Sequence, residues 1–104
     1  MLTELLAAIK LATGLDAGII AGQDLPRFVT VAPYAASSIY GEDANILDIP
    51  KVQIDIYVQE PDDTLPYDVA GVLQTFALPY TVEALMEYDE STNRLRTILQ
   101  AEVI

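Results

Sequence analysis

The side chains that could do chemistry in this sequence are almost all carboxylates. The 104 residues include 16 Asp and Glu against 5 Lys and Arg, which gives a net charge of −11 at pH 7. The sequence contains no His and no Cys, so the commonest general base, the commonest metal ligand and the thiolate nucleophile are missing. Catalytic triads, thiolate zinc sites and disulfides are therefore excluded.

The carboxylates themselves form no convincing catalytic or metal-binding motif. A pair of acids could work as in glycosidases, but among 16 acids some pairs always occur, and nothing marks one pair as lying in a cleft. The acidic turn at residues 89–93 lacks the central glycine and distal glutamate of an EF-hand loop. No glycine-rich phosphate-binding motif occurs. We expect a protein that is not an enzyme and that binds no metal and no cofactor.

The acidic balance also limits the partners. A nucleic-acid-binding protein needs a basic face, and anionic membranes attract basic segments. No apolar run reaches the roughly 20 residues of a membrane-spanning helix, and the first residues lack the basic start of a signal peptide. These features favour an acidic domain that binds other proteins.

Hydrophobic periodicity predicts the elements that must position these residues. Apolar residues at helical spacing from Leu2 to Ala12 predict a first helix of about three turns, which Thr3 could cap and Gly14 could end. Extended segments follow at 16–22 and 27–35, and Pro33 indicates a bulge or an edge position in the second. Strict alternation over residues 52–58 predicts a strand with one buried face.

The last third of the sequence predicts a helix and a hairpin. The helix begins after a cap at Asp63 or Thr64 and stops at Pro79. Residues 80–88 and 95–103 then pair as strands.

In the register that buries the apolar face of both strands, Glu87 lies opposite Arg96.

The fold class is therefore α+β, with two helices packed on a mostly antiparallel sheet in the order α-β-β-loop-β-α-β-β, as one domain over residues 1–104. We expect a core that contains Leu5, Leu6, Ile9, Val52, Ile54, Ile56, Val58, Val72, Leu73, Phe76, Val82, Leu99 and Val103.

Residues 37–49 show no clean period. Turn residues are mixed there with apolar ones, among them Tyr40, Ile46 and Leu47. A plain connection of this length is unusual in a compact domain. We expect a mobile loop that binds a partner and becomes ordered on assembly, with these three side chains at the interface.

Four more residues are interface candidates. Asp55 and Tyr57 share the polar face of the 52–58 strand, where each is either an ordinary surface residue or a contact with another subunit. Arg94 and Arg96 lie on the polar face of the last strand. Glu87 cannot satisfy both arginines, so we expect an acidic residue of a neighbouring subunit to pair with one of them.

Four short sequence motifs occur in order along the chain. They are LATGL at 11–15, LPRFV at 25–29, VQIDIYV at 52–58 and DESTN at 89–93, with a polar loop before the third. Over its whole length the chain resembles the small tail terminator (tail completion, minor tail) proteins of long-tailed bacteriophages and prophages.

The resemblance implies a structural virion protein, made in the host cytoplasm, at the junction of tail and head. Such proteins form a homo-oligomeric ring, a hexamer, that caps the head-proximal end of the tail tube and stops its growth. Their partners are the tail tube protein and the head connector protein. An acidic ring repels phosphates, so DNA would pass through the channel without specific binding.

Two alternatives remain open. A neck or head-closure protein could share this architecture. An acidic inhibitor that mimics DNA would share the charge, but its carboxylates would lie along one elongated face. Here the acids gather at turns, at 42–43, 62–63 and 89–90.

Overall fold

The computed structural model describes residues 2–14, 17–18, 26–41 and 44–102. Its elements are α1 (Leu2–Thr13), β1 (Ala17–Gly18), β2 (Phe28–Gly41), β3 (Ala44–Val58), α2 (Leu65–Thr75), β4 (Tyr80–Asp89) and β5 (Arg94–Glu102). The strands form one sheet in the order β1-β2-β3-β5-β4, with β1 parallel to β2 and the other pairs antiparallel. The α+β class and the order of elements are confirmed.

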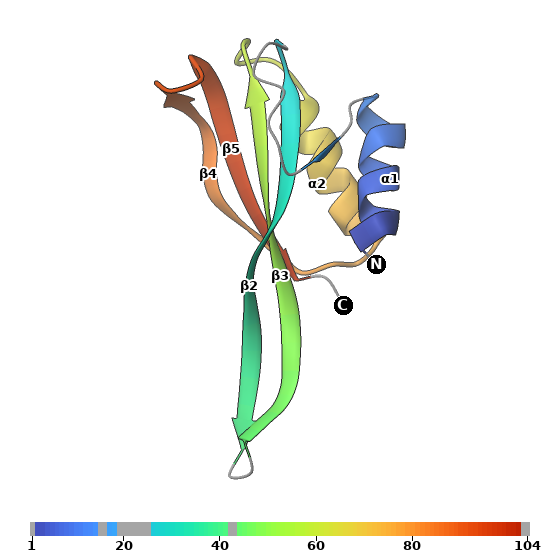
Figure 1. The fold of residues 1–104 in the computed structure, drawn as a ribbon. Helices are drawn as coiled ribbons and strands as arrows, with labels where there is room; N and C mark the ends of the chain where they lie inside the picture. The colour runs from blue at the N-terminus through green and yellow to red at the C-terminus, as the bar shows by residue number, and fades with distance from the viewer. Residues whose placement is uncertain (1, 15–16, 19–25, 42–43, 103–104) are drawn as a thin grey trace.

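Both helices cover the same face of the sheet (Figure 1). The alternation in β3 is confirmed, because its residues Val52, Ile54, Ile56 and Val58 are at most 3% exposed. They pack with α1, α2 and β5 in one core. Nine of the expected core residues are buried: Leu5, Ile9, Val52, Ile54, Ile56, Val58, Val72, Leu73 and Leu99.

The remaining expected core residues are partly buried, exposed, or outside the described residues. Leu6 and Phe76 are partly buried against the core. Val82 is 54% exposed, so its assignment to the core is wrong. It lies on β4, the edge strand that α2 leaves partly uncovered. Val103 lies outside the described residues.

Residues 37–49 are not a loop. Apart from 42–43, which lie outside the described residues, they continue β2 and β3 as an antiparallel ladder. Strand β5 accompanies β3 only from Lys51 to Val58. Residues 35–41 and 44–50, here called the arm, therefore pair only with each other among the described strands, and the arm projects far from the body (Figure 1). It lengthens the molecule to 49 Å, against 28 and 21 Å across.

The β4–β5 hairpin follows the expected register near its turn, where Glu87 is opposite Arg96. Continued without interruption, that register would set Val82 opposite Ala101, but Val82 faces Leu99. Two irregularities in β4 account for the difference. At the second, Met86 has a positive φ of 51° and its backbone N–H donates to Thr97 Oγ1 at 3.1 Å. A bulge also follows Pro33 in β2, as expected.

The start of α2 is fastened by Asp63. Its Oδ1 accepts a hydrogen bond from the backbone N–H of Leu65 at 2.9 Å and one from Arg27 Nη2 at 2.8 Å. Thr64, which lies between Asp63 and the first residue of α2, makes no side-chain cap bond. Of the two candidate capping residues, Asp63 is therefore the one whose side chain accepts a hydrogen bond at the start of α2. Through Arg27 it also connects the start of α2 to the residues just before β2.

Candidate interaction surfaces

The sheet face opposite the helices carries a stack of aromatic rings and arginines. The rings of Phe28 and Tyr57 stack with centroids 4.4 Å apart. Arg94 Cζ lies 5.3 Å from the Phe28 centroid and Arg96 Cζ lies 5.7 Å from the Tyr57 centroid. Both distances suit a cation–π contact. The stack crosses β2, β3 and β5 and holds together a face that no helix covers.

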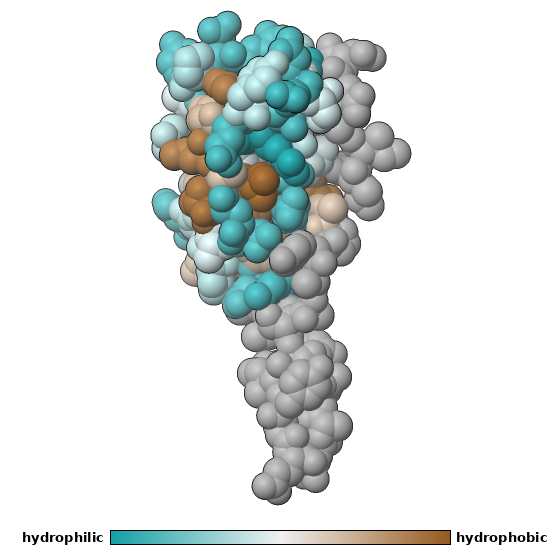
Figure 2. Space-filling model, turned by 90° about the vertical axis from the view of Figure 1, so that its left-hand side faces the viewer, coloured by the Kyte–Doolittle hydropathy of each residue, from teal (hydrophilic) through white to brown (hydrophobic). Residues whose placement is uncertain are grey.

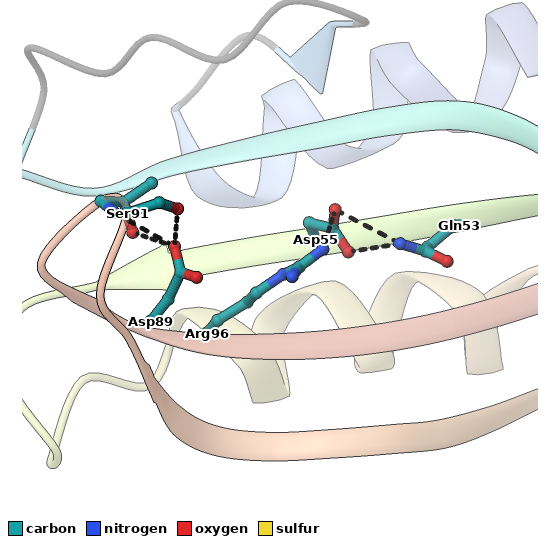
Figure 3. A network of polar contacts seen from close by, with 6 residues as sticks. Gln53, Asp55, Asp89, Ser91 and Arg96 are labelled. Carbon is teal, nitrogen blue, oxygen red and sulfur yellow. Dashed lines mark hydrogen bonds and ion pairs between the residues drawn. The ribbon is translucent and has the colours of Figure 1, made fainter.

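Asp55 connects this stack to its surroundings (Figure 3). It accepts a hydrogen bond from Arg96 Nη2 at 2.9 Å and bonds from Gln53 Nε2 at 3.1 and 3.4 Å. Arg96 thus finds a carboxylate within its own chain. Glu87 is therefore not the one acidic neighbour of the arginines within the chain, since the register places β3 beside β5. A contact of Arg96 with another subunit stays a prediction.

Tyr57 is held in place rather than presented to a partner. It is 8% exposed, between the ring of Phe28 and the guanidinium of Arg96. Burial raises the pKa of its hydroxyl, and the charge of Asp55 raises it further, while Arg96 acts in the opposite direction. The phenol, which is neutral at physiological pH as in any tyrosine, therefore resists ionisation at alkaline pH more than an ordinary tyrosine does.

Arg94 fastens the β4–β5 turn to the entrance of β2. Its Nη1 donates to the carbonyl of Thr92 at 2.6 Å, and its Nε donates to the carbonyl of Pro26 at 3.3 Å. A contact of Arg94 with another subunit stays a prediction, but these bonds give the side chain a structural role within one chain.

The acidic turn is hydrogen-bonded internally (Figure 3). Asp89 Oδ2 accepts bonds from Ser91 Oγ at 3.0 Å and from Thr92 N and Oγ1 at 3.2 and 2.6 Å. These side-chain bonds lower the pKa of Asp89. Within the part of the chain that the structure describes, no group of three or more potential metal ligands is gathered.

The arm holds the remaining interface candidates. In its ladder Tyr40 is opposite Asn45 and Leu47 is opposite Ile39, with Ile46 between Asn45 and Leu47. The three candidates therefore share the outer part of the arm. The other four, Asp55, Tyr57, Arg94 and Arg96, lie on the body, so the seven residues form two separate groups (Figure 1).

A groove of about 370 Å³ lies between α2 and β4, on the helix side of the sheet. Its lining includes Tyr67 and Ala70 from α2 and Val82 and Leu85 from β4, and it contains no Asp, Glu, Lys or Arg. Tyr67, Val82 and Leu85 are 63%, 54% and 52% exposed. Figure 2 views the molecule from the β4 side and shows hydrophobic surface, in brown, on an otherwise largely hydrophilic body.

The sequence did not indicate this groove. Val82 fitted the apolar face of a strand, and its exposure depends on how far α2 reaches across the sheet. The signal that existed is the run of three apolar residues Ala84, Leu85 and Met86 in β4, after Val82 and Glu83, which is denser than one buried face requires.

No helix among the described residues is long and apolar enough to cross a membrane. No protein-family model matches the sequence, and no curated protein matches it.

Proposed function

We propose that this chain is a structural ring protein of a long-tailed phage or prophage. Copies of it assemble at the head-proximal end of the tail tube, stop the growth of the tube and join it to the head connector. The resemblance of the sequence to tail terminator proteins suggests this role, and the observation that carries the proposal is the arm.

The arm is a feature that an isolated domain would gain little from. Over residues 44–50, β3 does not pair with β5. Both outer edges of the arm therefore lack a partner among the described strands. A two-stranded ribbon without a core is marginally stable in water. Unpaired edges are also a liability that soluble proteins normally cover. An assembly in which neighbours cover the arm removes both costs.

The charge is compatible with a channel for DNA. A net charge of −11 on each copy would surround the channel of a ring with negative potential, which keeps phosphates from binding to its wall. The same charge would suit a DNA mimic, but a mimic has no need of a projecting ribbon.

Electron microscopy of particles made without this protein tests the proposal. We expect tails longer than normal, with the normal length restored by the unaltered chain. A chain in which residues 37–49 are replaced by a short turn should fold but fail to restore the length. Tails of normal length without the protein would contradict the proposal, and full heads that leak DNA would favour a neck protein instead.

A further inference from the structure

We propose that the groove between α2 and β4 receives the arm of a neighbouring copy of the same chain. The inference rests on the proposed ring and names the two surfaces that join its subunits. It follows from the exposed apolar side chains of the groove, the few charges on the strands of the arm, and the positions of both on the molecule.

The groove is an uncharged, largely apolar surface that nothing in the described part of the chain fills. Three large apolar side chains at its wall, Tyr67, Val82 and Leu85, are each more than half exposed. Charged residues make up 20% of the sequence, yet none lines the groove. Exposed apolar surface of this kind in a soluble protein commonly marks an interaction site.

The strands of the arm match the groove because they carry few charges, although the sequence places Glu42 and Asp43 between them. All 14 residues of β2 are uncharged. Over residues 44–50 of β3, Asp48 is the one charged residue, and Ile46, Leu47 and Ile49 are apolar. A seven-residue strand of the arm extends about 23 Å, which fits alongside the 10 residues of β4.

Electrostatics favours a contact between these two surfaces over others. Two copies that each carry a charge of −11 repel one another, and burying an unpaired charge at their contact would add to the cost. The groove and the strands of the arm are where two such copies can approach with few charges between them.

The geometry requires that the arm come from another copy. The arm leads away from the body along the direction of β2 and β3, whereas the groove lies on the body beside α2 (Figure 1). Two different patches on one subunit give head-to-tail contacts, which close into a ring when the rotation permits.

The edge of β4 is poorly suited to take up a strand of the arm as an addition to the sheet. Two irregularities interrupt β4, one between Val82 and Ala84 and one between Ala84 and Glu87. Bulges of this kind protect an edge strand from pairing with another chain. They leave Leu85 exposed at the groove.

A mixing experiment tests the contact. One variant blocks the groove with Leu85→Glu, and a second alters the arm with Ile46→Glu and Leu47→Glu, because adjacent residues of a strand point to opposite faces. Each variant alone should assemble only at about tenfold or more higher concentration than the unaltered chain, measured by sedimentation. Mixed in equal amounts they should form one-to-one dimers, since one intact arm then meets one intact groove. Gln59→Glu, an equal charge change at an exposed position outside the groove, should assemble normally.

The absence of Cys allows a second measurement that does not depend on stable rings in solution. A chain with Ile46→Cys mixed with one carrying Leu85→Cys should cross-link into heterodimers, whereas Gln59→Cys in place of Leu85→Cys should not. The inference is overturned if both blocked variants assemble like the unaltered chain, or if neither Ile46→Cys nor, in a parallel mixture, Leu47→Cys cross-links to Leu85→Cys. Rings that need the arm and groove but leave tail length unchanged would overturn the proposed function alone.

Discussion

Asp55 connects two neighbours on the open sheet face, since it accepts hydrogen bonds from both Arg96 and Gln53. Truncating it would leave a partly buried guanidinium without its carboxylate. We expect Asp55→Ala to lower the free energy of unfolding by about 1–3 kcal/mol, and Asp55→Asn by less, because the amide oxygen still accepts a bond. Urea denaturation measures both. Equal losses for the two variants would show that the hydrogen bond is not what matters.

Tyr57 provides a second residue-level test, through pH. Its raised pKa, caused first by burial and then by the charge of Asp55, means that the folded chain holds this proton more tightly than the unfolded chain. The resulting stabilisation is complete below about pH 10 and is lost as the pH rises through the folded pKa. In an absorbance titration we expect a tyrosine ionisation step above the pH at which an ordinary tyrosine ionises, and we assign it to Tyr57. Tyr57→Phe should abolish that late step; a step that persists belongs to another tyrosine.

At the scale of elements, β3 is the centre of the body, and its inner face could be predicted because burial on one side produces alternation. Ile56 is fully buried there. We expect Ile56→Ala to cost about 2–5 kcal/mol through lost burial and a cavity. Tyr67→Ala, at a side chain that is 63% exposed, is the matched control and should cost far less. Thermal or urea unfolding compares the two, and equal costs would contradict the assignment of the core.

The arm belongs to the same two strands but could not be predicted, for a physical reason. Among the described strands no third strand pairs with the arm, so the requirement for a buried face, which produces alternation in the 52–58 strand, is weaker for residues 37–49. The mixed apolar and turn residues at Ile39, Tyr40 and Gly41 therefore resembled a loop. Similarly, the register of β4 could be predicted only from the β4–β5 turn back to Glu87, where the irregularity between Ala84 and Glu87 begins.

Hydrogen exchange tests the arm as an element. Amides of residues 35–41 and 44–50 bond only across one ladder, whereas those of residues 52–58 lie between two neighbouring strands over a core. In the isolated subunit we expect the arm to exchange much faster than the central strand. Assembly should slow the arm more than any other segment. Protection in the arm equal to that of the central strand, before assembly, would mean that it needs no partner.

At the scale of the whole molecule, an acidic body carries an arm whose strands hold one charged residue, Asp48, and a groove without charged lining residues. The proposed head-to-tail contact between copies joins these two surfaces. The guanidinium groups of Arg94 and Arg96, which the sequence suggested as intersubunit contacts, donate hydrogen bonds within the chain. The body of the fold could therefore be predicted, while the assembly surfaces could not, because they depend on which parts of the body the helices leave uncovered.

The most direct test of this account is the mass of the purified chain, measured by sedimentation at 0.1 M and 1 M salt. Raising the salt shortens the screening length from about 10 Å to about 3 Å, which weakens both ion pairs and the repulsion between copies that each carry a charge of −11. Contacts between uncharged surfaces predict a closed oligomer of fixed size whose share of the protein stays constant or rises with salt. A chain that is monomeric at both salt concentrations, or an oligomer that dissociates as salt is added, would contradict the account.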